Sequence, residues 1–332
     1  ERVNYPTYKD KDKAAKVLSE FEQLASEYKS FIGWRRNPVN LVYTNIESDY
    51  RTRKSFNQSL DKSIWFFGGS TIWGTGVSDN ETIPSNVAKI TNEKVFNFGE
   101  SAWNSRQSLN QLISVIGDGK IPKKVIFYDG VNEIYGCYAN SLNLKMPFHG
   151  RETLIKDSVK GSSNFYGAGA RFSGILNYIS LKLTEPYILL FKNFQSRNQV
   201  SKIEQPYECD SNKKVTSDVA KHLLNNWYSA YLITKAKGAD FIGILQPALH
   251  SSNTPKSYLP LEDYENEVNN YKHIYERIRI EIKNSCSYDK NFCESLIDGS
   301  KWINSKKPVF IDSAHLNKHG NKIIAEKIIE GF

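Results

Sequence analysis

Three residues of this 332-residue chain have the side chains and the spacing expected of a nucleophilic catalyst: Ser70, Asp312 and His315. Ser70 follows two glycines at the end of an apolar run, residues 64–67, which is typical of a buried strand. A serine hydroxyl is a poor nucleophile until a base removes its proton. Because Asp312 precedes His315 by three residues, its carboxylate can hold one ring nitrogen and leave the other for Ser70. The three residues together predict nucleophilic chemistry at Ser70, although a Gly-Gly-Ser turn or an Asp-x-x-His spacing alone is common.

The same chemistry needs hydrogen-bond donors that stabilise the negative oxygen of the tetrahedral intermediate. The sequence offers three candidates for this oxyanion hole: the backbone N–H groups of Ser70 and Gly99, and the side-chain amide of Asn132. Gly99 follows a predicted strand at residues 95–98, and Asn132 follows another at residues 124–128. Each also has an ordinary interpretation, since Gly99 could be a turn residue and Asn132 a cap.

Predicted strands and helices alternate from residue 62 to the end of the chain. The expected strands cover residues 62–67, 95–98, 124–128, 240–245 and 308–311, and the expected helices cover residues 82–90, 105–116, 217–237, 261–283 and 317–329. This alternation predicts an α/β fold, a three-layer α/β/α sandwich around a flavodoxin-like five-stranded parallel sheet. Right-handed crossovers would bring all the carboxyl ends of the strands to one edge, and the candidate residues with them.

Two segments do not fit the alternation. Residues 1–60 form a predicted N-terminal extension packed on the core, with helical spacing over residues 13–28 and an extended stretch over residues 39–46. Residues 138–215, within the predicted domain 61–332, form an insertion after the third strand, which we expect either to cap the site or only to pack on the sheet. The extension contains five basic residues that we expect at a solvated rim or facing an acidic glycan: Arg35, Arg36, Arg51, Arg53 and Lys54.

The formal net charge of +8 favours acidic partners, such as an anionic polysaccharide or a membrane surface. Nucleic acid is not expected, because no basic helix, zinc knuckle or aromatic RNA-binding signature accompanies the charge. A solvated basic surface without a specific partner is the simpler alternative.

The four cysteines predict two disulfides, Cys137–Cys209 and Cys286–Cys293, and hence an oxidising compartment. The alternative is four free thiols in a cytosolic protein. No Cys-x-x-Cys pair indicates zinc or a redox site, and no long apolar run indicates a membrane span. Because the chain begins at Glu1, an upstream signal or membrane tether is compatible with it. We expect a periplasmic or other extracytoplasmic location in the cell envelope.

Four short blocks, in this order, resemble those of the SGNH (GDSL-like) serine hydrolases: Gly68-Gly69-Ser70, Asn97-Phe98-Gly99, Gly130-Val131-Asn132-Glu133 and Asp312-Ser-Ala-His315. The resemblance implies the SGNH hydrolase fold, with Ser70 as nucleophile and His315 as base with Asp312 behind it. It also implies that Gly99 and Asn132 complete the oxyanion hole with Ser70.

The sequence Gly-Gly-Ser-Thr-Ile-Trp-Gly around Ser70 resembles the corresponding segment in a bacterial branch of this family that is linked to cell-surface polysaccharides and their O-acyl groups. The chain departs from the usual family pattern at Gly69 and at Glu133, where Asp is common. Neither departure removes a catalytic atom, so both concern the subgroup and the substrate.

The leading hypothesis is a serine-dependent carbohydrate esterase that acts on an O-acetylated or otherwise O-acylated cell-surface polysaccharide through an acyl-enzyme. The same triad would serve an O-acetyltransferase if a sugar hydroxyl replaced water as the acceptor. A non-catalytic glycan-binding protein with this fold is a further alternative, because fold does not fix function.

A metal-dependent hydrolase is the remaining alternative, with Asp312, His315 and His319 as ligands. No second cluster of ligands accompanies these residues, and His319-Gly320 fits the start of the last helix. We therefore expect neither a metal nor another cofactor.

Overall fold

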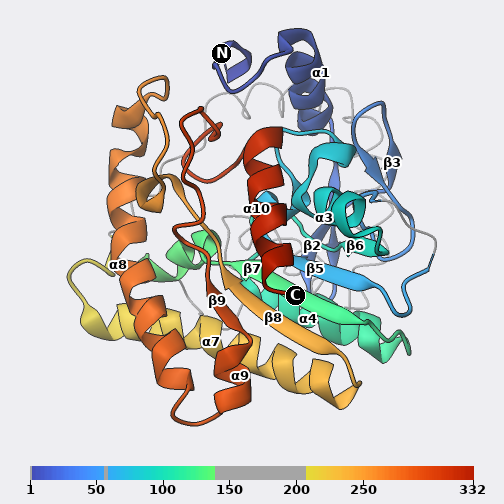
Figure 1. The fold of residues 1–332 in the computed structure, drawn as a ribbon, viewed down its shortest axis with the longest axis vertical. Helices are drawn as coiled ribbons and strands as arrows, with labels where there is room; N and C mark the ends of the chain where they lie inside the picture. Colours follow the sequence, from blue (N-terminus) through green and yellow to red (C-terminus); the bar gives the residue numbers. More distant parts are fainter. Residues whose placement is uncertain (1, 56–58, 139–206) are drawn as a thin grey trace, which may run out of the picture. The chain divides into compact units, whose positions relative to one another are not determined.

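A five-stranded parallel sheet forms the centre of the computed structural model, which describes residues 2–55, 59–138 and 207–332 (Figure 1). Its strands are β5 (Ile64–Gly68), β6 (Val95–Asn97), β7 (Lys124–Asp129), β8 (Asp240–Leu245) and β9 (Leu296–Asp298). They lie in the order β6-β5-β7-β8-β9, and every neighbouring pair is parallel. This flavodoxin-like order confirms the predicted fold class.

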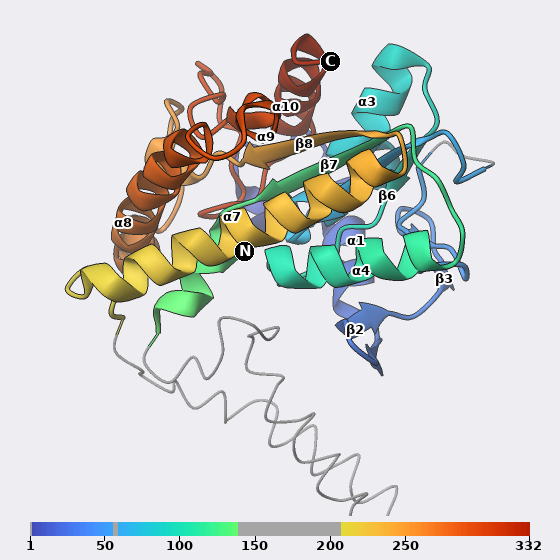
Figure 2. The ribbon, with the colours of Figure 1, turned by 90° about the horizontal axis from the view of Figure 1, so that it is seen from below.

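Helices cover both faces of the sheet, which explains why the central strands are apolar on both sides. One face is covered by α4 (Ser105–Gly117) and α7 (Lys213–Ala236), and α8 (Leu261–Ser285) packs beside α7. The other face is covered by α3 (Ile83–Thr91) and α10 (Lys318–Glu330) (Figure 2). Along β5, Trp65 and Phe67 pack in the core on the α4 and α7 side, whereas Phe66 packs in the core on the α3 and α10 side. The predicted helices are confirmed with shifts of a few residues at their ends.

The fifth strand was predicted in the wrong place. Residues 308–311 were expected to form it, but they are a buried loop, and the fifth strand is β9. The backbone of this loop pairs with the chain that follows it. The Ile311 N–H donates to the carbonyl of His315 at 2.9 Å, and the Val309 carbonyl accepts the N–H of Asn317 at 2.8 Å. A short apolar run shows that a segment is buried, but it does not show whether its backbone joins a sheet.

The N-terminal extension is less helical than predicted, because α1 (Lys11–Glu22) ends before residue 28. It continues as two small antiparallel pairs, β1 (Ser26–Lys29) with β2 (Gly33–Arg36) and β3 (Val39–Asn40) with β4 (Asn45–Ile46). The remaining short elements are η1 (Arg2–Asn4), α2 (Ser70–Trp73), η2 (Asp79–Glu81), η3 (Val131–Cys137), η5 (Leu249–Ser251) and α9 (Lys290–Glu294).

Three of the five basic residues expected at a solvated rim are buried in the core of the protein. Arg35 and Arg53 are each 1% exposed, and Arg36 is 7% exposed. They are buried because their guanidinium groups donate to backbone carbonyls and carboxylates of the α/β domain. The extension is thus joined to the domain by buried hydrogen bonds.

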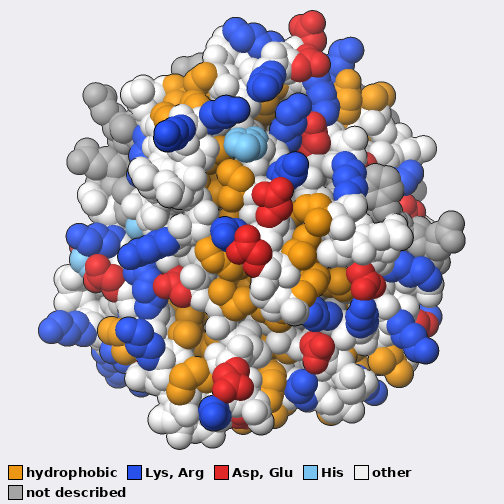
Figure 3. All heavy atoms as spheres, in the orientation of Figure 1, with side chains coloured by type: hydrophobic (Ala, Val, Ile, Leu, Met, Phe, Trp, Pro, Cys, Tyr) orange, Lys and Arg blue, Asp and Glu red, His pale blue; other side chains and the backbone are white. Residues whose placement is uncertain are grey.

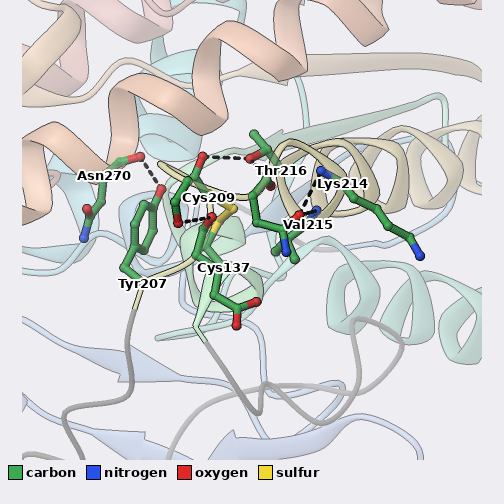
Figure 4. Close-up of a disulfide and its surroundings, with 10 residues drawn as sticks. Cys137, Tyr207, Cys209, Lys214, Val215, Thr216 and Asn270 are labelled. Carbon is green, nitrogen blue, oxygen red and sulfur yellow. Dashed lines mark hydrogen bonds between the residues drawn. A yellow bond between two sulfur atoms is a disulfide. The ribbon is translucent and has the colours of Figure 1, made fainter.

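Both predicted disulfides are present. Cys137, at the end of η3, bonds Cys209 with a Cα–Cα distance of 5.2 Å, and the Cys209 carbonyl accepts from the Thr216 hydroxyl in α7 (Figure 4). Beside them, the Tyr207 hydroxyl donates to the Asn270 carbonyl of α8. Most of the predicted insertion 138–215 lies outside the described residues; the described part, Tyr138 and residues 207–215, is joined to the domain here.

On the face shown in Figure 3, Lys and Arg side chains are spread over the surface with Asp and Glu side chains between them. The net positive charge is therefore not gathered into one patch on this face. No helix in the described part of the chain is both long enough and apolar enough to cross a membrane.

Candidate active site

Ser70 is the first residue of α2 and is separated from the end of β5 only by Gly69, so it lies at the carboxyl edge of the sheet. The carbonyls of Gly69 and Ser70 accept the N–H groups of Trp73 and Gly74, which makes a single tight helical turn. A side chain at position 69 would collide with the side-chain amide of Asn132 and would lie 3.2 Å from the Trp103 carbonyl. Glycine at this position therefore lets the Asn132 amide approach the chain beside Ser70.

A chain of hydrogen bonds connects Ser70 to His315 and Asp312. The Nε2 atom of His315 lies 2.7 Å from the Ser70 Oγ, although the two residues are 245 positions apart in the sequence. The Nδ1 atom of His315 lies 2.9 and 2.8 Å from the two carboxylate oxygens of Asp312. With the Nδ1–H donated to the carboxylate, Nε2 is free to accept the proton of the Ser70 hydroxyl.

Asp312 is held in its ionised form by its surroundings. Its Oδ1 accepts the backbone N–H groups of Ala314 and His315, at 3.0 and 2.8 Å, and Arg2 Nη1 lies 3.4 Å from Oδ2. Burial alone raises the pKa of a carboxyl group, but the charge and hydrogen bonds of His315 outweigh it and lower the pKa of Asp312 to about 2. The carboxylate is therefore charged at neutral pH and can orient the imidazole and stabilise its cation.

Asn132 and Gly99, the two further residues predicted for the oxyanion hole, differ in whether they keep a free hydrogen-bond donor. Asn132, at the start of η3, donates one amide hydrogen to the Trp103 carbonyl at 2.6 Å, which fixes the amide and leaves its second hydrogen. The N–H of Gly99 instead donates to the side-chain oxygen of Asn97 at 3.0 Å. A donor already used inside the protein does not stabilise a substrate oxygen, so the structure does not support the predicted role of Gly99.

Next to Asn132 lies a pair of buried carboxyl groups that the sequence did not single out as a pair. Glu133 accepts the N–H of Ser105 at 2.8 Å, at the start of α4, and Asp129 accepts the indole N–H of Trp227 at 2.9 Å. Burial raises the pKa of Glu133 to about 7, against the effect of its hydrogen bonds to Ser105. Burial, together with the charge of Glu133, raises the pKa of Asp129 well above its usual range.

Of the three ligands considered for a metal-dependent hydrolase, Asp312 and His315 contact each other, but His319 does not form a group with them. His319 lies in the first turn of α10, where its backbone N–H donates to the side-chain oxygen of the cap residue Asn317. Within residues 2–55, 59–138 and 207–332, no three His, Cys, Asp or Glu side chains form a group that could hold a metal ion. His315 is instead occupied by Ser70 and Asp312.

No family model and no curated protein matches the chain. The chain is similar in structure to lipolytic proteins of the G-D-S-L family. One, from Desulfitobacterium hafniense, is 10% identical with a TM-score of 0.43, and the match covers 82% of this chain and 100% of that one. Another, from Veillonella parvula, is 12% identical with a TM-score of 0.43, covering 81% of this chain and 97% of that one. A carbohydrate acetylesterase from Sinorhizobium meliloti is 12% identical with a TM-score of 0.41, covering 82% and 100%.

From the sequence, no role was predicted for the residues that donate hydrogen bonds to the backbone of α2, the helical turn that begins at Ser70. The side-chain amide of Asn97 donates to the Ile72 carbonyl at 2.9 Å, and Arg53 donates to the carbonyls of Trp73 and Gly74. Asn97 could have been found, because it stands in the second block of the family resemblance. Arg53 gave no signal, since a lone arginine in a basic stretch is usually exposed.

The raised pKa of Glu133 predicts a pH-dependent stability. Between about pH 4.5 and 7 the folded protein keeps a proton at Glu133 that the unfolded chain has lost, so the free energy of unfolding falls as pH rises through this window. Glu133→Gln keeps an oxygen that can accept the Ser105 N–H and removes the charge. The free energy of unfolding, measured with urea at about pH 5 and about pH 8, should fall between the two pH values in the wild-type protein. In Glu133→Gln this fall should be smaller by a few kcal/mol, at about 1.4 kcal/mol per pKa unit. The exposed Glu326→Gln is the control, and an unchanged pH dependence in Glu133→Gln would contradict the assignment.

Proposed function

We propose that the protein is a serine esterase of the SGNH type that removes acyl groups from a carbohydrate. The observation that carries the proposal is the hydrogen-bond chain from Ser70 Oγ through His315 to Asp312, with 2.7 Å between Oγ and Nε2. A histidine placed between a serine and a buried, ionised aspartate is the arrangement that activates a serine nucleophile. The order of the four sequence blocks supports the same reading.

The proposed reaction uses this hydrogen-bond chain. As Ser70 Oγ attacks the ester carbonyl, His315 Nε2 takes its proton, and the carboxylate of Asp312 stabilises the imidazolium that forms. The C–O bond to the sugar then breaks, and the imidazolium returns the proton to the leaving sugar oxygen. In the second half, His315 takes a proton from a water molecule whose oxygen attacks the acyl carbon of the acyl-serine. The bond between that carbon and Ser70 Oγ then breaks, His315 returns the proton to Oγ, and the carboxylic acid leaves.

We propose that the oxyanion hole uses the N–H of Ser70, the second amide hydrogen of Asn132 and, in place of Gly99, the N–H of Ala102. Ala102 has a φ of 60°, an uncommon conformation for a residue with a side chain, and it precedes Trp103, whose carbonyl fixes the Asn132 amide. Within the described ranges of the chain, the Ala102 N–H donates no hydrogen bond. Strained backbone of this kind is often found at functional sites.

The proposed substrate is an O-acetyl or other O-acyl group on a polysaccharide of the cell envelope. The sequence around Ser70 supports a carbohydrate, through its resemblance to the branch linked to surface polysaccharides. The two disulfides support an extracytoplasmic location, because disulfides persist in oxidising compartments.

The proposal is tested with Ser70→Ala, measured on p-nitrophenyl acetate and on acetylated oligosaccharides. We expect kcat/KM to fall by more than about 10³-fold, since removal of a triad nucleophile has effects of this size or larger. The exposed Ser211→Ala should keep wild-type activity, and circular dichroism should show that both variants are folded. Turnover by folded Ser70→Ala at the wild-type rate would show that Ser70 is not the nucleophile.

The close approach of Gly69 and Asn132 gives a second prediction. Gly69→Ala should displace the Asn132 amide, so both Gly69→Ala and Asn132→Ala should lower kcat by about 10²-fold, as expected when one oxyanion donor is lost. Because both act through one amide, the double variant should be little worse than either single variant. Losses that simply multiply in the double variant would mean that the two residues act independently.

A further inference from the structure

The helix that begins at Ser70 is too short to be stable by itself. It spans four residues, Ser70–Trp73, and a single isolated turn fixes the backbone in return for very few hydrogen bonds. The carbonyls at its carboxyl end also have no partner within the helix. Groups from elsewhere must therefore hold this turn, and with it the nucleophile.

The Asn97 amide holds the carbonyl of Ile72, and Arg53, from the N-terminal extension, holds the backbone from Trp73 onward. Its Nη1 donates to the carbonyls of Trp73 and Gly74, at 2.9 and 2.7 Å, and its Nη2 donates to the carbonyl of Val77 at 2.7 Å. Its Nε donates to a carboxylate oxygen of Asp79 at 2.8 Å. The side chain is fully buried, so these bonds are shielded from water and balance its charge.

The aromatic ring at the end of the helix is held in the same way. The guanidinium carbons of Arg36 and Arg53 lie 4.1 and 4.2 Å from the centre of the Trp73 ring. Arg36 is held in turn by an ion pair with Glu100, and the ring of Phe21 meets Trp73 edge-on at 5.6 Å. The ring of Trp73 is therefore held between Arg36, Arg53 and Phe21, and its backbone carbonyl is held by a hydrogen bond from Arg53.

Gly74 makes this approach possible. It has a φ of 93°, which a residue with a side chain rarely adopts, and a Cβ there would lie 3.0 Å from Arg53 Nη1 and 2.5 Å from Thr82. The guanidinium therefore packs directly against the backbone that follows the nucleophile helix. A lysine could not replace it, because one ammonium group lacks the planar set of donors that meets three carbonyls and a carboxylate at once.

We propose that Arg53 is a positioning residue of the active site: it fixes the carboxyl end of α2 and so keeps Ser70 Oγ within hydrogen-bond reach of His315. This inference rests on the proposed function. It makes the N-terminal extension a part of the catalytic unit, although none of its residues need touch the reacting atoms for Arg53 to act in this way. A displacement of Ser70 by about 1 Å would be enough to lower the rate by about 10²-fold.

The experiment uses Arg53→Lys in the full chain, with two readouts: kcat and KM on p-nitrophenyl acetate, and the rate at which a fluorophosphonate labels Ser70. We expect kcat and the labelling rate to fall together by about 10- to 100-fold, with KM within about twofold of the wild-type value. Leu112→Ala, a fully buried position in the core on the other face of the sheet, controls for lost stability. It should keep the wild-type kcat at a temperature where it is folded.

Asp79→Asn is the second variant, for the case in which Arg53→Lys does not fold. It removes the negative charge that pairs with the buried guanidinium but keeps a side-chain oxygen for it, so kcat and the labelling rate should fall in the same way by a smaller factor. Wild-type values of both rates in the folded variants, or an equal loss of kcat in Leu112→Ala, would overturn the inference while leaving the esterase proposal intact. Absence of labelling at Ser70 in the wild-type protein would instead overturn the proposed function and the positioning role with it.

Discussion

The proposed active site depends on one hydrogen bond, the 2.7 Å contact between His315 Nε2 and Ser70 Oγ. It joins a turn after β5 to a loop before α10, and it is productive only if both are held to within a fraction of an ångström. Much of the surrounding structure serves this purpose. Asp312 fixes the imidazole and is itself fixed by two backbone N–H groups of its own loop.

The two halves of the site are held by different physical means. Ser70 lies where α/β proteins usually carry their chemistry, at the carboxyl end of a central parallel strand. His315 does not follow a strand: its loop is buried, and the hydroxyl of Tyr258 donates to the carbonyl of Phe310 within it. Apolar burial of residues 309–311, together with side-chain hydrogen bonds, supports the loop that carries His315 in place of the hydrogen bonds of a sheet.

Much of this arrangement could be predicted from the sequence. Short apolar runs ending in glycine or polar residues placed four of the five strands, and the order of four blocks selected Ser70, Asn132, Asp312 and His315. Other features could not be predicted, because they depend on contacts between distant residues. Burial of a loop at 308–311 has the same pattern as burial of a strand, and the use of the Gly99 N–H by Asn97 is visible only in three dimensions.

The buried arginines show the limit most clearly. Composition predicts that a basic stretch is exposed, yet Arg35 and Arg53 find enough carbonyl and carboxylate partners to be buried. Those partners lie in segments that follow later in the chain, so the residues near each arginine in the sequence do not predict its burial. The proposed site is therefore larger than the four sequence blocks, because the positioning role that we propose for Arg53 adds part of the N-terminal extension to it.

The central claim is that Ser70 carries the acyl group during turnover. The most direct measurement is acid quenching of the wild-type protein during hydrolysis of a saturating acetyl ester, followed by peptide mass spectrometry. The account predicts an acetyl group on the Ser70 hydroxyl that appears during turnover and disappears when the substrate is exhausted. Steady hydrolysis with Ser70 unmodified and the acetyl group on another residue would contradict it.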